Sequence, residues 1–452
     1  MLGTRGIQRA TSTVEPGRTG RHVAAQQGQP AGQHGGARHR APGGRSDQAS
    51  MRRSNMGLLL RHLKDHAGQS RARVAAETGL SKATTSSLIG DLVERGLVTE
   101  GELHRAGSVG RPGLALHLDG RHLCGVGLEI NVDYLSVNAL DLTGTVLHEA
   151  TRPIDAAALS VDEVLAEVAD LLRSTMRSVR GRGVRTVAIA IAAPGSIDVD
   201  TGQVQFAPNV GWRDVPLVKG VGRRLGRTAP PILLENDAKL GAVAEYAAVS
   251  HSGVRDLLYV TGDVGVGGGI ITDGRLLRGF SGFAGEIGHL PLGPQGHPCA
   301  CGRSGCWETM VGLTAFLRLV ADQGDPVRDT GRPLEDRLAE ISTRADHGDD
   351  RVLAGIDAIA EGLGVGVSLL VDILNPRLVI LGGYFAYLAE RLVGPVSAHL
   401  AARRMSPESE CVVTGSTLGL TSAARGAAHL ALETVFRDPV NVGRPQAKAH
   451  SA

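Results

Sequence analysis

The residues best suited to chemistry lie in one short window of the chain. The segment EIGHLPLGPQGHPCACGRSGCWE, residues 286–308, holds three of the chain's five cysteines, Cys299, Cys301 and Cys306. His289 precedes the first of them by ten residues. Three thiolates and one imidazole at this spacing are typical of a tetrahedral zinc site. Because such a set fills every ligand position, we expect the zinc to be structural rather than catalytic.

Two alternatives stay open for the metal ligands. His297 lies in the same window and could replace His289. Two of the cysteines could instead form a disulfide bond, although nothing else in the sequence indicates an oxidising compartment. A zinc-braced loop would also hold Glu286, Glu308 and the second ring nitrogen of His289. These hydrogen-bonding groups suit a ligand with many hydroxyl groups.

The composition excludes several classes of protein. Of the 452 residues, 42% are hydrophobic and 21% are charged, which is ordinary for a globular protein of two or three domains. The net charge is only +2, so any affinity for nucleic acid must come from a local basic patch. The sequence has no apolar run long enough to cross a bilayer and no apolar signal core. We therefore expect a cytoplasmic protein with no membrane partner.

Both ends of the chain differ in composition from the rest. Residues 1–50 are rich in Gly, Gln, Arg and Pro, so they cannot bury enough apolar surface to order themselves. We interpret them as disordered, or as the result of a translation start assigned before a true start at Met51 or Met56. A basic arm that strengthens DNA binding is the functional alternative. Residues 437–452 are predicted to form a disordered tail.

A small DNA-reading module is predicted at residues 51–118. Residues 56–66 carry leucines at helical spacing, Ser70 can cap a short second helix, and Ser81 can cap a third helix over residues 82–95. A glycine turn precedes that third helix, and a strand, a basic glycine-rich loop and a second strand follow it. This order predicts a winged helix-turn-helix, which resembles those of MarR-like bacterial regulators.

The positions of the DNA contacts follow from this module. The outer face of the third helix is where major-groove contacts usually arise, and it carries Lys82, Ala83, Thr84, Ser86 and Ser87. In the wing, Arg105, Arg111 and Pro112 suit contacts with phosphates or with the minor groove. The alternative is a small helical subdomain that binds a protein.

Strands and helices alternate over residues 119–436. The strand PILLEND ends in a polar triplet, at the end where open α/β sheets bind their ligands. DLLYVTGDVGVGGGIITDG is expected to form a glycine-rich hairpin. Residues 352–374 are expected to be helical, interrupted by glycines at 362, 364 and 366. The class is therefore α/β.

This body resembles the ROK family of bacterial sugar kinases and transcriptional repressors. The resemblance covers nearly all of residues 119–436 and rests on GFSGFAGEIGHLPLG, CACGRSGCWE, the ENDA tetrapeptide at 235–238 and VGVGGGII. It implies the actin-like, ribonuclease H-like fold of two lobes. A winged helix fused in front is the arrangement of that family's repressors rather than of its free-standing kinases.

The resemblance also implies a sugar pocket. The positions that bind sugar hydroxyls in the family correspond here to Asn236, Asp237, Glu286, His289 and Glu308, and Asn209 is a weaker candidate. His289 would use one ring nitrogen for zinc and the other for the sugar. Asp237 matches the kinases' general base, which takes the proton from the hydroxyl that is phosphorylated.

The nucleotide side departs from the kinase pattern. Kinases of the family carry Asp-x-Gly-Gly-Thr on the first strand, where this chain reads Glu-Ile-Asn-Val-Asp at 129–133. Their second phosphate loop reads Gly-Thr-Gly, whereas Asp263 and Val264 precede Gly265 here. Two unit charges about 5 Å apart repel by about 3 kcal/mol at an effective dielectric near 20. We therefore predict no useful ATP binding, and we interpret the glycines at 265 and 267–269 as turn residues.

The leading hypothesis is a sugar-responsive transcriptional regulator, acting as a repressor on carbohydrate uptake or catabolism genes. It would bind double-stranded operator DNA as a homodimer or a tetramer, and its effector would be a sugar or a sugar phosphate. The alternatives are a hexose or N-acetylhexosamine kinase with a DNA-binding appendage, and a scaffold whose body binds a protein.

Overall fold

The computed structural model describes residues 44–101, 114–280, 282–403 and 410–442. Every element below, apart from the first residues of α1, belongs to one compact unit that begins at Gln48. The wing tip with Arg105, Arg111 and Pro112 lies outside the described residues. Most of the segment 1–50 does so as well.

Three helices and a small sheet form the N-terminal module. The helices are α1 (Gly44–Asp65), α2 (Arg71–Thr78) and α3 (Lys82–Glu94), and the antiparallel sheet has the order β1 (Gln69–Ser70), β3 (Ala115–Leu118), β2 (Val98–Gly101). Both serines expected as caps accept a backbone N–H, Ser70 from Arg73 and Ser81 from Thr84. Gly79 makes the turn at φ 72°. α1 begins at Gly44, so regular structure starts seven residues before the expected domain boundary at 51.

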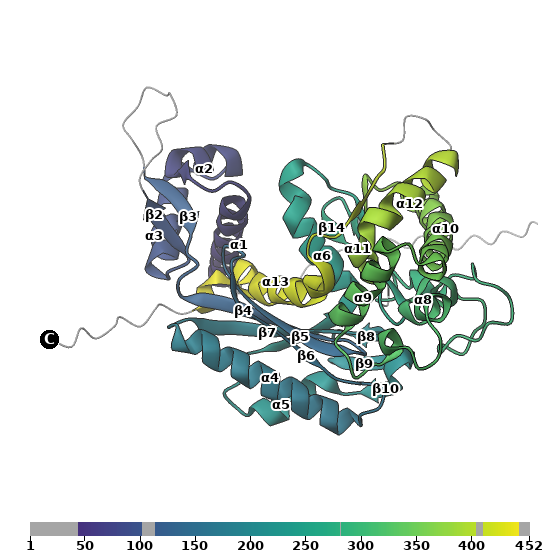
Figure 1. Ribbon diagram of the computed structural model, residues 1–452. Coiled ribbons are helices and arrows are strands. Elements are labelled where there is room, and N and C mark those ends of the chain that lie inside the picture. The colour runs from purple at the N-terminus through teal and green to yellow at the C-terminus, as the bar shows by residue number, and fades with distance from the viewer. Residues whose placement is uncertain (1–43, 102–113, 281, 404–409, 443–452) are drawn as a thin grey trace, which may run out of the picture. The chain divides into compact units, whose positions relative to one another are not determined.

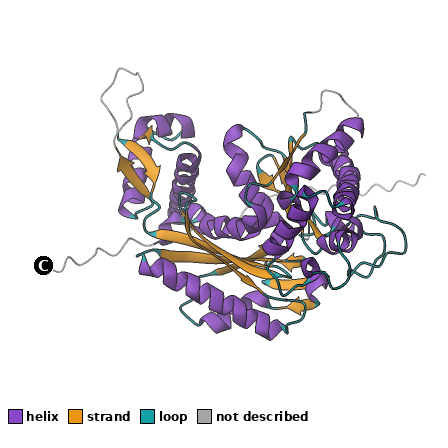
Figure 2. Ribbon diagram, viewed as in Figure 1, coloured by secondary structure: helices purple, strands orange, loops and turns teal. Residues whose placement is uncertain are grey.

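The first lobe of the body is built on a five-stranded sheet of order β11-β7-β4-β5-β6. Its strands are β4 (Leu123–Ile130), β5 (Tyr134–Asp141), β6 (Val146–Pro153), β7 (Arg185–Ala193) and β11 (Ile232–Asn236). The helices α4 (Val161–Gly181) and α5 (Leu217–Leu225) lie on one face, and α13 (Ser422–Arg437) lies on the other (Figures 1 and 2). A small sheet of β8 (Ser196–Asp198), β9 (Gln203–Ala207) and β10 (Trp212–Val215) extends the lobe.

The second lobe is built on a sheet of order β14-β13-β12-β15-β16. Its strands are β12 (Leu257–Gly262), β13 (Val266–Thr272), β14 (Arg275–Leu276), β15 (Leu378–Gly383) and β16 (Val412–Gly415). The helices are α6 (Asp237–Val249), α7 (Glu308–Val311), α8 (Leu313–Val320), α9 (Leu334–Asp346), α10 (Asp350–Leu374), α11 (Tyr384–Tyr387) and α12 (Ala389–Arg403). The chain passes between the lobes at β11–α6 and at β16–α13. The predicted hairpin of β12 and β13 is confirmed.

The long helix α10 is continuous, contrary to the expected interruption by glycines. These glycines make room for neighbours, because a Cβ at Gly366 would overlap the indole of Trp307 and one at Gly362 would lie 2.6 Å from Val311. α10 is also long and apolar enough to cross a membrane by composition, but 61% of its most apolar window is buried in the protein. This burial is what a core helix of a folded domain shows.

The N-terminal module shares its hydrophobic core with the C-terminal helix. Leu59, Leu63 and Leu92 of the module are in one cluster of buried residues with Leu432 and Phe436 of α13. Leu58, expected on the apolar face of α1, is instead 42% exposed. The module is therefore packed onto the body through α13.

The C-terminal tail is partly ordered, contrary to the expected disorder of 437–452. Residues 439–442 form a 3₁₀ helix in which Pro439 and Val442 are buried. Arg95 donates to the Val440 carbonyl oxygen at 2.7 Å, so this segment is held by a helix that is distant in sequence. Residues 443–452 lie outside the described part of the chain.

The shared core predicts that a substitution in α13 destabilises the N-terminal module. Phe436→Ala should lower the free energy of unfolding by about 3–5 kcal/mol, because a buried aromatic side chain is lost and a cavity is left. Urea unfolding followed by circular dichroism measures this change. Leu58→Ala is the control and should stay within about 0.5 kcal/mol of the parent protein, because Leu58 is exposed. Equal effects of the two substitutions would contradict a shared core.

Candidate functional site

A polar cavity of about 90 Å³ lies between the two lobes. The first lobe contributes the end of β7, the turn after β9 and the end of β11, and the second contributes the β12–β13 turn and the segment 285–289. The lining includes every residue expected to bind a sugar, namely Asn209, Asn236, Asp237, Glu286, His289 and Glu308. Residues that are up to 99 positions apart in the sequence, 209 to 308, therefore face one space.

The strand-to-helix junction of β11 and α6 positions Asn236 and Asp237. Asn236 is the N-cap of α6, and its side-chain oxygen accepts the N–H of Lys239 at 3.1 Å. Its amide nitrogen donates to the Gly195 carbonyl oxygen at 3.1 Å and to Asp237 Oδ1 at 2.9 Å. Asp237 Oδ1 also accepts the N–H of Ala238 at 2.7 Å. These bonds fix the carboxylate at the edge of the cavity.

Burial raises the pKa of Asp237 to about 7. Desolvation is the main cause, and the nearby carboxylate of Asp263 adds to it, while the N–H of Ala238 acts in the opposite direction. A carboxyl group with this pKa exchanges its proton near neutral pH. It can accept a hydrogen bond from a ligand hydroxyl as the carboxylate, or donate one as the acid.

Glu286 and His289 are positioned by a short 3₁₀ helix, Ile287–His289, that packs against β13. The contact is close because a Cβ at Gly288 would overlap the Val266 carbonyl oxygen, and one at Gly285 would overlap that of Gly268. Gly285 also needs φ 99°, which other residues rarely adopt. Backbone packing thus brings this segment to the cavity wall.

Glu308 is the first residue of α7, and its side chain also lines the cavity. A Cβ at Gly265 would lie 2.6 Å from Glu308 Oε2 and 2.8 Å from Asn209 Nδ2, so glycine is needed there to leave room for both side chains. The other carboxylate oxygen of Glu308 lies 2.7 Å from Cys299 Sγ and 3.6 Å from His289 Nδ1. Glu308 therefore joins the polar cavity to the cysteine cluster.

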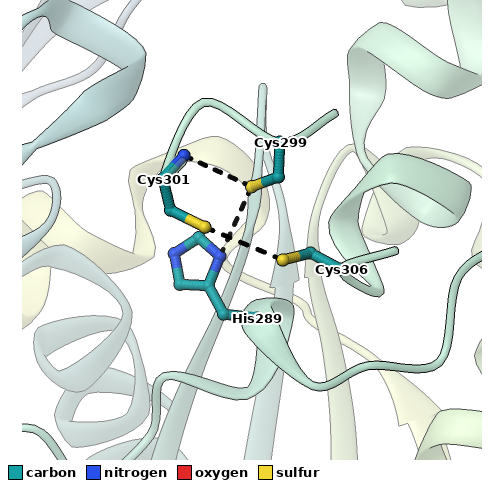
Figure 3. Close-up of side chains that lie close together, drawn as sticks. All are labelled: His289, Cys299, Cys301 and Cys306. Carbon is teal, nitrogen blue, oxygen red and sulfur yellow. Dashed lines mark hydrogen bonds between the residues drawn. The ribbon is translucent and has the colours of Figure 1, made fainter. Parts of the chain in front are cut away.

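The cysteine cluster could hold a metal ion. Four side chains converge in Figure 3, those of His289, Cys299, Cys301 and Cys306. Each offers one ligand atom, and these four atoms lie within 4.8 Å of one another. The sulfur atoms of Cys301 and Cys306 are 3.7 Å apart, well beyond the length of a disulfide bond. His297 is exposed and is not a member of this group. Three thiols and one imidazole are the donor set that zinc prefers.

Several carboxyl groups line a second, much smaller cavity. A second cavity next to the first has a volume of only about 10 Å³ and is lined by Glu129, Tyr134, Asp237 and Asp263 among others. Tyr134 donates to Glu129 Oε1 at 3.0 Å. Burial raises the pKa values of Glu129 and Asp263. Such a space fits about one water molecule.

The glycines at 265 and 267–269 were interpreted as turn residues. Gly265 does lie in the turn between β12 and β13, but the interpretation is wrong for the other three. Gly267, Gly268 and Gly269 lie within β13, and no glycine at 265–269 has a positive φ. Their role is close packing. A Cβ at Gly267 would lie 2.6 Å from Ala238 and one at Gly268 would lie 2.6 Å from Ile287. Small residues here let α6 and the segment 285–288 approach the same strand.

Two family models match the chain. The model described as "ROK family" matches residues 125–434, which is more than half of the chain. The chain belongs to the ROK family. The model described as "MarR family" matches residues 57–107, within the N-terminal module. Both resemblances seen in the sequence are confirmed.

Relatives in the ROK family include both repressors and kinases. The xylose repressor of Caldicellulosiruptor bescii is 30% identical over 345 residues, which are 75% of this chain and 85% of that protein. The glucokinase of Halalkalibacterium halodurans is 30% identical over 287 residues, which are 61% of this chain and 85% of that enzyme.

Solved structures confirm the predicted fold. A ROK family transcriptional regulator, described as a homologue of the E. coli MLC protein, has a TM-score of 0.69 over 86% of this chain and 97% of its own, at 23% identity. The ROK family glucokinase from Streptomyces griseus, solved with glucose and AMPPNP, has a TM-score of 0.58 over 69% of this chain and 99% of its own, at 27% identity. The ROK sugar kinase-like α/β body and the N-terminal helix-turn-helix are thus established.

The predicted DNA-contacting residues of α3 lie on its solvent side. Lys82, Ala83, Ser86 and Ser87 are exposed, and Thr84 is partly buried with its hydroxyl 2.8 Å from that of Ser81. The neighbouring Thr85, Leu88 and Ile89 point into the core. Ser86 is partly engaged within the protein, because Arg71 donates to its hydroxyl oxygen at 2.9 Å.

Sequence reasoning missed several residues of this ROK body. Tyr134 and Thr261 line the cavities, Arg278 pairs with Glu235 at 2.7 Å, and the buried Lys239 donates to the Gly282 carbonyl oxygen. Lys239 directly follows the ENDA tetrapeptide, so its position was a signal. Tyr134 carried no signal, because a tyrosine that begins a strand is ordinary for a core residue.

The raised pKa of Asp237 predicts a change of stability with pH. Because the folded state favours the protonated carboxyl, the unfolded state ionises first and stability should fall as pH rises from about 4 to about 7. Asp237→Asn should flatten this dependence and raise the thermal midpoint most near pH 7. Scanning calorimetry from pH 5 to pH 8 measures both. Parallel curves for the two proteins would mean that Asp237 titrates normally.

Proposed function

We propose that this ROK protein is a sugar-responsive transcriptional repressor of carbohydrate uptake or catabolism genes. One observation carries the proposal. The winged helix module shares a core with a body whose interlobe cavity is lined by six polar residues that suit sugar hydroxyls. The repressors among its relatives, named for xylose and for N-acetylglucosamine, support it.

The sugar would bind between the lobes. Asn236 and Asp237 would contact its hydroxyls from the junction between β11 and α6, where the chain passes between the lobes, with Asn209 of the first lobe as a further contact. Glu286, His289 and Glu308 would contact it from the second lobe. Planar carboxylate and amide groups at both walls match the alternating hydroxyls of a sugar ring or a sugar phosphate. Binding from both sides would favour one separation of the lobes.

The cysteine cluster would hold a structural zinc ion. His289, Cys299, Cys301 and Cys306 would be the ligands, and the ion would fix the loop that carries Glu308. The ion supplies no chemistry in this proposal. Its role is to fix the orientation of the His289 imidazole, and through the loop that of the Glu308 carboxylate, so that both face the cavity.

Kinase activity is not part of this proposal. Asn131, Val132 and Asp133 replace the kinases' Gly-Gly-Thr, and Asp263 adds a carboxylate at the second phosphate loop. A triphosphate would lack the glycine backbone cradle and would meet added negative charge. The competing function, a sugar kinase, is favoured by Asp237, which matches the kinases' general base, and by the similarity to a glucokinase.

The repressor would bind operator DNA as a homodimer or tetramer. Lys82, Ala83, Thr84, Ser86 and Ser87 would read the major groove, and Arg105, Arg111 and Pro112 would contact phosphates or the minor groove. The domains would be a DNA-reading part at 51–118 and a sugar-binding part at 119–436, in a cytoplasmic protein without a membrane partner. A hundredfold change in DNA affinity needs about 2.7 kcal/mol of differential sugar affinity.

The first prediction of this proposal concerns operator release. Fluorescence anisotropy of the full chain on DNA from upstream of its own gene should show specific binding that one of D-xylose, D-glucose or N-acetyl-D-glucosamine weakens. Lys82→Ala should reduce binding to this DNA, because the helix face loses its cation. Specific binding that no free or phosphorylated sugar alters would contradict the sugar response.

The second prediction concerns the cavity residues. Asp237→Ala and Glu286→Ala should remove the sugar response and leave operator affinity unchanged, because both side chains lie in the cavity rather than in the winged helix. The matched control is Asp322→Ala, whose exposed carboxylate pairs with Arg351 and is not part of the cavity lining. A cavity variant that still releases DNA at the parental sugar concentration would overturn the pocket assignment. ATP turnover with the same sugars would revive the kinase alternative.

The third prediction concerns the metal. The purified protein should contain about one zinc ion per chain, and Cys306→Ser should lose most of it, because a buried ligand is replaced by a weaker one. Elemental analysis by mass spectrometry gives the content. Cys124→Ser is the control, since Cys124 is buried far from the cluster beside Thr186, and it should keep the metal. Equal zinc in both variants would refute the site.

A further inference from the structure

Two polar contacts join the lobes at the positions where this chain departs from the kinase motif. Asn131 and Asp133 lie in the β4–β5 turn of the first lobe. Asn131 Nδ2 donates to Asp263 Oδ1 at 3.2 Å, and Asp263 follows β12 in the second lobe. Arg337 of α9, also in the second lobe, donates to Asp133 Oδ2 at 3.2 Å. In kinases of the family the corresponding positions serve nucleotide phosphates.

The Asp133–Arg337 pair is deeply buried. The two side chains are 6% and 2% exposed. Arg337 Nε also donates to the Val327 carbonyl oxygen at 2.8 Å, and the Asp133 N–H donates to Asn131 Oδ1 at 3.2 Å. A charge out of water is tolerated only when its partner stays in place. Separating the β4–β5 turn from α9 would leave both charges unpaired, so this pair strongly depends on the spacing of the lobes.

We propose that Asn131, Asp133, Asp263 and Arg337 form an interlobe latch. The latch replaces the nucleotide as the group that bridges the lobes, and it favours the lobe arrangement in which the cavity is lined from both sides. Sugar binding at the cavity and closure of the latch require the same arrangement, so each strengthens the other. The proposal thus deepens the proposed function and rests on it for the sugar response.

The geometry explains why these residue types replace the kinase motif. A glycine or threonine at 131–133 leaves room for phosphate oxygens but cannot reach α9 or the β12–β13 turn. Asn131 and Asp133 span those distances and bond directly to the second lobe. The first residue of β5, Tyr134, is also part of the core cluster of the second lobe, so an apolar contact holds the end of the turn beside the polar contacts.

The latch is tested by removing its charges together. The double variant Asp133→Leu with Arg337→Met keeps apolar volume in place of the pair and leaves neither charge alone. In the full chain on its operator, the sugar concentration for half-maximal release should rise about tenfold or more. Amide exchange without sugar should quicken at residues 130–135 and at the start of α9. Asp133→Asn replaces the side chain by one of nearly equal size without its charge, and it should shift both readouts in the same direction but by less. This single variant is the test if the double variant fails to fold.

Arg344→Met is the matched control. Arg344 lies on the same helix α9, but its partners Asp325 and Glu340 belong to the same lobe. It should change neither the sugar midpoint nor the exchange at 130–135. A sugar midpoint for the latch variants within about twofold of this control, or unchanged exchange, would overturn the latch. If the parent protein shows no sugar response at all, the proposed function fails, while the exchange readout still decides the latch.

Discussion

Close backbone packing around β13 is the constraint on which the site depends. Without side chains at Gly267 and Gly269, α6 lies directly on one face of the strand, and without them at Gly268 and Gly285 the segment with Glu286 lies on the other. Attractive contacts between polar groups and a small ligand need positions accurate to a fraction of an ångström. Backbone contact supplies that accuracy, because a backbone has no rotamers to adjust.

The electrostatics of the interlobe space follow from the same packing. The carboxyl group of Glu129 is buried, those of Asp237 and Asp263 are partly buried, and desolvation raises the pKa values of all three. The charge of Asp263 further raises the pKa values of Glu129 and Asp237. Hydrogen bonds from Tyr134, Asn131 and Thr261 satisfy part of this charge. The result is an acidic region at the cavity wall in which Asp237 can exchange a proton near neutral pH.

The helix α13 connects this region physically to the N-terminal module. Its first residues line the small cavity, and its last turn is in the core of the module with α1 and α3. Arg61 donates to the Phe436 carbonyl oxygen at 3.2 Å and also pairs with Glu433. The packing of α13 along β4 is equally tight, since a Cβ at Gly127 would overlap the Ala424 carbonyl oxygen. A helix held at both ends can transmit a change in lobe spacing to the position of the winged helix.

The sequence alone determined the family, the fold class, the helix caps at Ser70 and Ser81, and the residue types of the site, because these depend on local patterns and spaced motifs. It did not determine the continuity of α10, the order of residues 439–442, or the packing role of the glycines in β13. Each of these depends on a neighbour that is distant in the chain. The same reason applies to Asp133, which the sequence presents as a lost phosphate motif. Only the tertiary structure pairs it with Arg337, 204 residues away, because burial between two lobes brings the charges together.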